Sequence, residues 1–199
     1  MKRVGICLLV TVIVWAVMLL RDHQMLRNEL IRLHVVAASD NPEDQTLKLQ
    51  VKDAVVESLQ KNMENLADME QAEIYLQQQL PKIEALANRV LQEAGCGDVA
   101  TVSLQLEEFA TRYYDTFTLP AGIYESLRIT IGPGEGKNWW CVVFPTLCVG
   151  ATVEEFEETA HCAGFSDALT GALTGEEPYE VRFFVLDALG RLENFLHKG

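Results

Sequence analysis

Residues 4–20 form an uncharged apolar segment, which constrains this chain more than any other feature of its sequence. Thr11 is the only polar side chain in it, Lys2 and Arg3 precede it, and Arg21 follows it. A basic start before an apolar stretch is typical of a secretory signal or a signal anchor, and a membrane-spanning helix needs about 17–25 such residues. The alternative, a buried N-terminal helix of a soluble protein, is disfavoured because the segment has no polar face.

The sequence leaves open whether this segment is removed after export. Val14 and Ala16 form a weak small-residue cleavage pattern, which Trp15 and Met18 make less convincing. Residues 1–21 are therefore interpreted either as a signal peptide that is cleaved or as a membrane anchor that is retained. The basic residues before the segment place the N-terminus in the cytoplasm, so the rest of the chain is expected outside the membrane.

The acidic charge of the chain excludes several classes of partner. Residues 1–21 hold three of the 16 Lys and Arg and none of the 29 Asp and Glu, so residues 22–199 carry a net charge of −16. Nucleic acid and anionic lipid both attract basic surfaces, and neither is an expected partner. The hydrophobic fraction of 49% excludes intrinsic disorder. The membrane is therefore expected to be contacted only through the N-terminal segment.

The exported region is predicted to be a single α+β domain with a mainly antiparallel sheet backed by helices. Residues 22–30 are interpreted as a linker and residues 31–199 as the domain. Helix-start signals predict one helix from the Asn41 N-cap to about residue 65 and another after the Asp68 cap. The apolar run 31–37 is predicted to be the first strand.

The second half of the chain is predicted to be rich in strands. Alternating apolar residues indicate strands near 102–106 and 123–131, and the apolar run 138–144 indicates a third. The glycine-rich turn at 132–136 predicts that the last two form an antiparallel hairpin. The remaining predictions are an acidic helix over 152–163, a mobile loop over 164–178, a strand over 179–186 and a terminal helix after it.

No arrangement of residues in the sequence indicates an enzyme or a metal site. Cys141 with His34 or His161 is a candidate nucleophile and base, but no local signature surrounds either position. The neighbours His161 and Cys162 cannot chelate a metal well, and zinc is not expected. The glycine run 132–136 lies between strands rather than before a helix, so it does not predict a phosphate site. Catalytic residues, cofactors and metals are all predicted to be absent.

Five segments of the sequence carry a resemblance to a known family, the stage II sporulation protein R family. Segments 31–40, 44–48 and 51–53 resemble the start of its exported domain, and 119–129 resembles its central hairpin. Segment 136–148 is the most specific, with two adjacent Trp, then Cys, Phe-Pro and a second Cys. The family often has Asn at the position of Ala38, and an alanine cannot make the polar turn contact that an Asn side chain offers.

The resemblance implies an intercellular signalling protein of endospore formation. Members are made in the forespore and exported to the space between forespore and mother cell, where they activate a membrane-embedded aspartic protease of the mother cell. That protease processes the sigma-E precursor. The implied role is that of a ligand and not of an enzyme. The alternatives are an exported hydrolase that uses Cys141 and a structural or chaperone-like envelope protein.

The candidate partner-binding residues fall in two places, the start of the first predicted helix and the last apolar strand. They are Ser39, Asp40, Asp44, Gln45, Lys48, Trp139 and Trp140. Adjacent strand residues point to opposite faces, so one of the two Trp is expected in the core and the other towards solvent or a helix. The simpler alternatives are a helix cap with its exposed face, and two Trp that are both buried between sheet and helices.

Cys141 and Cys148 lie seven positions apart outside the cytoplasm, where a disulfide is stable. A bridge across so short a loop contributes on the order of 2 kcal/mol; the alternative is two buried thiols. If the bridge is present, reduction of the intact chain adds the mass of a pair of hydrogen atoms in mass spectrometry before alkylation. An unchanged mass excludes it.

Overall fold

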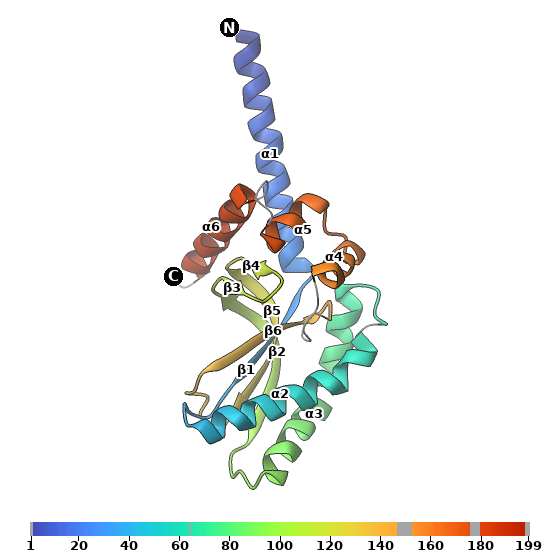
Figure 1. The fold of residues 1–199 in the computed structure, drawn as a ribbon, viewed down its shortest axis with the longest axis vertical. Coiled ribbons are helices and arrows are strands. Elements are labelled where there is room, and N and C mark those ends of the chain that lie inside the picture. The colour runs from blue at the N-terminus through green and yellow to red at the C-terminus, as the bar shows by residue number, and fades with distance from the viewer. Residues whose placement is uncertain (1, 64, 147–152, 176–179, 198–199) are drawn as a thin grey trace. The chain divides into compact units, whose positions relative to one another are not determined.

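The computed structural model describes residues 2–63, 65–146, 153–175 and 180–197, and the chain forms two compact units (Figure 1). The helical unit comprises Met1–Asn28, Glu108–Ile123 and Thr152–Gly199. The sheet unit comprises Glu29–Glu107 and Tyr124–Ala151. The sequence predicted one domain over 31–199 after a linker; the boundaries of the signal, linker and exported region stay predictions.

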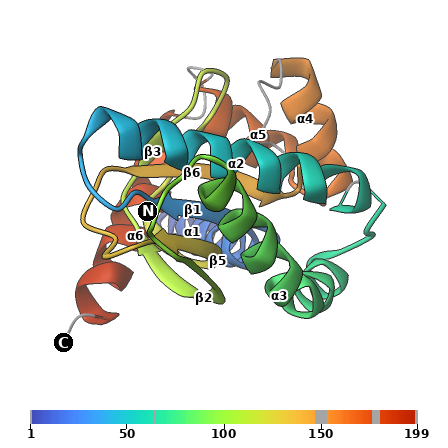
Figure 2. The same cartoon turned by 90° about the horizontal axis from the view of Figure 1, so that it is seen from below.

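A four-stranded sheet with mixed strand directions forms the centre of the sheet unit. The strand order is β2-β5-β1-β6 (Figure 2). β1 runs parallel to β5, with Leu33 opposite Leu127, and antiparallel to β6, with Leu33 opposite Cys141. The α+β class is therefore confirmed. The strands are β1 (Ile31–Val36), β2 (Ala100–Phe109), β5 (Gly122–Ile131) and β6 (Asn138–Phe144).

The predicted hairpin between β5 and β6 is wrong, because β1 lies between these strands. All six residues of β1 are buried, and a strand buried on both faces belongs in the interior of a sheet. Strand period and turn composition indicate that two segments are strands, but they do not indicate which strand is inserted between them. The mainly antiparallel sheet of the prediction is consequently a mixed one.

α2 (Pro42–Met63) and α3 (Met69–Glu93) lie side by side on one face of the sheet (Figure 2). Both starts follow the predicted capping. The carbonyl of Asn41 accepts the first helical bond, from Gln45 at 3.0 Å, and the carboxylate of Asp68 accepts the N–H of Gln71 at 2.9 Å. Apolar residues of both helices pack on the same face of the sheet. They include Val51, Val55, Leu59, Leu76, Ile83 and Leu91.

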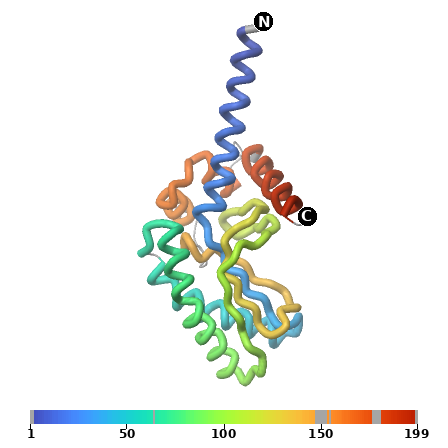
Figure 3. The backbone as a smooth tube through the Cα atoms, turned by 180° about the vertical axis from the view of Figure 1, so that it is seen from behind, coloured from blue at the N-terminus to red at the C-terminus, as the bar shows by residue number. Residues whose placement is uncertain are grey.

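The helical unit is built around α1 (Lys2–Asn28), which continues through most of the predicted linker. Its apolar N-terminal part is exposed, whereas Leu19 and Leu26 are buried. Figure 3 shows α6 (Glu180–His197) beside the second half of α1. Two short strands pair in the same unit, β3 (Arg112–Tyr113) and β4 (Thr118–Leu119).

Two further predictions in the C-terminal region are wrong. The segment predicted as a loop contains α5 (Asp167–Thr174), capped by the Ser166 hydroxyl and by Gly175 in the left-handed conformation. The segment predicted as a strand over 179–186 is, from Glu180 on, the first half of α6. Three alternating apolar residues are too few to distinguish the two-residue period of a strand from the 3.6-residue period of a helix. The helix continues for three turns beyond them. α4 (Val153–Cys162) is the predicted acidic helix.

Gly190 brings α6 against the backbone of the β4–β5 connection. A Cβ at this position would lie 1.6 Å from the Ala121 carbonyl oxygen, so we expect Gly190→Ala to lower the free energy of unfolding by about 3 kcal/mol. Gly97→Ala is the matched control, since no atom lies within 4 Å of its added methyl group. Urea unfolding of the full chain in detergent measures both; equal midpoints would contradict the packing.

Candidate functional site

The structure brings the five predicted site residues of the β1–α2 connection together. The Ser39 hydroxyl donates to the Asp44 carboxylate at 2.5 Å, and the Gln45 amide donates to the Ser39 carbonyl at 2.8 Å. The Lys48 ammonium donates to the Gln45 side-chain oxygen at 2.6 Å. These residues and Asp40 are called the 39–48 cluster below. Its polar side chains hold the chain in the bend from which α2 starts.

The 39–48 cluster also holds the loop between β5 and β6. The Asp40 carboxylate accepts the backbone N–H of Lys137 at 2.7 Å, and the Lys48 ammonium donates to the Lys137 carbonyl at 3.0 Å. The N–H of Gly136 donates to the Ala37 carbonyl at 3.0 Å. A Cβ on Gly136 would approach the Ser39 carbonyl oxygen to 2.2 Å, so only glycine permits this contact. Two separate segments are thus fixed as one surface.

Lys48 lies inside this arrangement, whereas Asp40 is exposed. Burial lowers the pKa of Lys48, and the Asp40 charge opposes that shift. An ammonium with two protein acceptors and almost no solvent exposure acts as an internal support. Asp40 is therefore the accessible one of these two side chains. That any residue of the cluster contacts a partner stays a prediction.

Trp139 and Trp140 point to opposite faces of the sheet. Trp139 is opposite Val35 in the register, is 37% exposed, and has the Lys52 ammonium 4.9 Å from its ring centroid. Trp140 is opposite His34 and stacks on it, with ring centroids 5.5 Å apart and an interplanar angle of 16°. Neither indole is fully buried. Trp139 offers the larger accessible aromatic surface.

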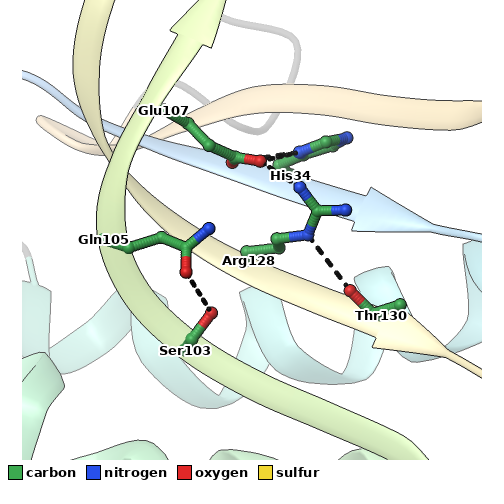
Figure 4. A network of polar contacts seen from close by, with 6 residues as sticks. All are labelled: His34, Ser103, Gln105, Glu107, Arg128 and Thr130. Atoms are coloured by element: carbon green, nitrogen blue, oxygen red, sulfur yellow. Dashed lines mark hydrogen bonds and ion pairs between the residues drawn. The ribbon is translucent and has the colours of Figure 1, made fainter.

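A polar network that the sequence analysis missed lies on the sheet face opposite the two helices (Figure 4). Glu107 of β2 receives a hydrogen bond from His34 of β1 at 3.0 Å and forms an ion pair with Arg128 of β5. Arg128 also donates to the Thr130 hydroxyl at 3.2 Å. Alternation in β2 and β5 did indicate polar faces. The sequence could not indicate that Glu107 pairs with His34 and Arg128, because this pairing depends on the order of the strands in the sheet.

The network controls the ionisation of Glu107. Burial alone raises the pKa of this carboxyl, but the hydrogen bond from His34 and the charges of His34 and Arg128 outweigh it and lower the pKa to about 2. Further along the same face, the buried Arg32 guanidinium lies 5.0 Å from the Tyr124 ring centroid. We call this face of the sheet the polar sheet face. Its charged side chains are held in place by contacts with one another and with Tyr124.

The structure places Cys141 and His34, one of the two catalytic pairs considered from the sequence, on opposite faces of the sheet; the pairing of Cys141 with His161 stays untested. Leu33 and Cys141 share the face that packs on the helices, while His34 lies on the polar sheet face. Cys141 is buried and disulfide-bonded; Cys148 lies outside the described residues, so the identity of its partner stays a prediction. The described residues contain no group of three or more His, Cys, Asp or Glu that could hold a metal ion.

A hollow of about 500 Å³ borders the 39–48 cluster. The first turns of α2 form one wall, from Pro42 to Gln50, and residues 94–96 after α3 form the other. Asp44 is shared between the hollow and the cluster. The exposed corner of the sheet unit therefore combines a fixed polar rim, a concave surface and one accessible indole.

These features describe a chain with an exposed apolar N-terminal helix and an α+β unit that has a fixed polar corner. Within the part of the chain that the structure describes, one helix is long and apolar enough to cross a membrane, Arg3–Asn28, and a signal sequence meets the same criterion. A family model described as stage II sporulation protein R matches residues 27–154. The chain belongs to this family.

A curated relative supports the assignment. The chain is 35% identical over 136 residues to Stage II sporulation protein R of Bacillus subtilis (strain 168), an alignment that covers 66% of this chain and 61% of the relative. The chain thus spans less than two thirds of that protein's length. No solved structure matches it. The family match includes every predicted site residue and ends before α5 and α6.

The lowered pKa of Glu107 predicts an acid-sensitive contribution to stability. A carboxyl whose pKa falls from 4.5 to about 2 on folding stabilises the protein above pH 4.5, and this contribution disappears as the pH falls towards 2. At neutral pH it is on the order of 3 kcal/mol. We expect Glu107→Gln to lose that stability at pH 7 and to flatten the decline of unfolding free energy below pH 4.5.

Glu135→Gln is the control for this change. Glu135 is an exposed carboxylate on the β5–β6 loop of the same unit, so its removal should leave the acid decline as steep as in the parent. Unfolding free energies from urea titrations between pH 7 and pH 2 give both slopes. An equally steep decline in Glu107→Gln would refute the network's role.

Proposed function

We propose that this chain is an exported signalling protein of endospore formation. It is made in the forespore, reaches the intermembrane space and activates a membrane-embedded aspartic protease of the mother cell, which processes the sigma-E precursor. Membership of the stage II sporulation protein R family over residues 27–154 carries this proposal. The N-terminal apolar helix supports export, either as a signal or as an anchor.

The arrangement of the sheet unit favours a ligand over an enzyme. Three of its ionisable groups, those of Glu107, Arg128 and Lys48, are engaged with other protein groups, and Cys141 is shielded on the helix-packed face. A ligand needs a fixed surface of defined shape, because preorganisation reduces the entropic cost of binding. The loop held by the 39–48 cluster meets this need.

The contact surface for the protease is proposed at the exposed corner formed by Asp40, Trp139 and the hollow beside α2. Trp is enriched in the residues that dominate binding energies, and Trp139 is the accessible member of the pair. The rim around it contains the exposed Asp40 and Glu43. Activation also requires that the protease bind this surface more tightly in its active state than in its inactive state.

We expect Trp139→Ala to reduce cleavage of the sigma-E precursor strongly. Loss of a hot-spot Trp costs about 2 kcal/mol or more, which corresponds to roughly thirtyfold in affinity. The assay exports the full chain into a compartment that faces cells producing the protease and the precursor, and it follows precursor cleavage by immunoblot. An unchanged thermal midpoint shows that the variant is folded.

Tyr113→Ala is the matched control, since this aromatic side chain is highly exposed in the helical unit and its loss should leave cleavage at the parent level. Equal precursor cleavage with Trp139→Ala and with the parent would show that Trp139 is not part of the contact surface. No cleavage with the folded, correctly delivered parent would overturn the signalling function. Crosslinking that recovers wall or division proteins instead of the protease would favour the structural envelope protein.

A further inference from the structure

The outer face of α6 exposes a continuous stripe of apolar side chains. Phe184 and Phe195 are 71% and 75% exposed, and the stripe follows the helical repeat at steps of three and four residues. No charged side chain interrupts it. The stripe, called the α6 stripe below, consists of Val181, Phe184, Ala188, Leu192, Phe195 and Leu196.

Several polar side chains of α6 bind to other parts of the helical unit, whereas the side chains of Arg191 and His197 are largely exposed. Asp187 accepts hydrogen bonds from the Thr111 hydroxyl at 2.5 Å and from the Ala121 N–H at 2.9 Å. Glu193 forms an ion pair with Arg27 of α1. Asp187 and Glu193 thus attach α6 to the helical unit, while the α6 stripe itself consists of apolar groups. Exposed apolar area of this kind marks a contact surface.

The attachment of α6 to α1 indicates what covers the stripe. The Arg182 guanidinium donates to the Asp22 carboxylate at 2.5 Å, and His23 lies 3.7 Å from the Glu193 carboxylate. These contacts begin two residues after the exposed apolar segment ends at Leu20. Figure 3 shows the two helices together at this level. A bilayer that holds residues 4–20 therefore lies next to the N-terminal end of the stripe.

The size of the stripe and the charge of the chain favour lipid over protein. A stable protein interface uses about 20–30 residues on each side, far more than one helix face. A tether, however, keeps a weak contact at high effective concentration. The strong negative charge of residues 22–199 disfavours a second copy of the chain and an anionic lipid surface. It leaves an uncharged headgroup layer as the complementary surface.

We infer that the α6 stripe lies in the interfacial layer of the same bilayer that α1 enters. Phe and Leu side chains of such helices reach the boundary between headgroups and acyl chains, about 5–10 Å deep. The contact gives the helical unit a second attachment to the membrane and fixes its rotation about α1. This inference concerns the chain that retains α1, and it does not depend on activation of a protease.

Tryptophan quenching by brominated lipid tests the contact. The full chain with Trp15→Phe and Phe195→Trp is reconstituted in phosphatidylcholine nanodiscs with plain or brominated acyl chains. The emission of the Trp15→Phe chain alone, which holds Trp139 and Trp140, is subtracted as background. We expect the remaining emission, that of the introduced indole, to fall about twofold or more in brominated discs, as expected at the acyl boundary. The effect should persist in high salt, since no charge is involved. Phe195 is well exposed, so the substitution spares the fold.

Ile74→Trp in the same Trp15→Phe chain is the matched control, because Ile74 is an exposed apolar residue on α3 of the sheet unit. Its emission should not change, and the parent's Trp15 should be quenched as a marker of α1 insertion. Equal emission of the Phe195→Trp chain in both lipids overturns the inference. Unquenched, blue-shifted emission with two copies per disc identifies a second copy as the occupant. Emission that is not quenched and has the wavelength of a solvent-exposed indole would show that the stripe does not contact the bilayer, and would indicate a different protein as its partner.

Discussion

The burial of β1 between β5 and β6 is the constraint on which the rest of the sheet unit depends. Its alternate residues serve two different environments: Leu33 packs towards the helices, and His34 faces the polar network. The parallel pairing with β5 and the antiparallel pairing with β6 bring Arg128 and Trp140 to either side of His34. The end of the strand then leads directly into the 39–48 cluster, so both halves of the site depend on one buried strand.

Local sequence signals predicted the parts of the fold that local interactions determine. The start of α2 after Asn41 and the cap of α3 at Asp68 depend on groups within four residues, and both were predicted. The order of the strands depends on contacts between distant segments. The insertion of β1, and with it the mixed sheet, therefore could not be predicted from period and turn composition. In α6, a short alternation at 181–185 fits both the strand and the helix period, and the segment forms the start of a helix that continues to His197.

The candidate site shows the same division. The gathering of Ser39, Asp44 and Gln45 follows from their spacing at a helix start and was predictable. The support that Lys48 gives to Lys137 joins positions 89 apart, and the pair of His34 and Glu107 joins positions 73 apart. No single-sequence pattern indicates such pairs. They are consequences of the strand order, and they determine which polar residues are supports and which remain accessible.

The helical unit is assembled from three separate stretches of the chain, with its first and last helices joined by the pair of Asp22 and Arg182, 160 positions apart. A chain exported from its N-terminus, as proposed for this one, delivers α1 before the sheet unit and α6 after it. The sheet unit then has all its strands and helices available before α6 emerges, whereas the helical unit can close only after α6 has crossed. The proposed export would thus impose an order on folding in which the pairing of α6 with α1 follows the assembly of the sheet unit.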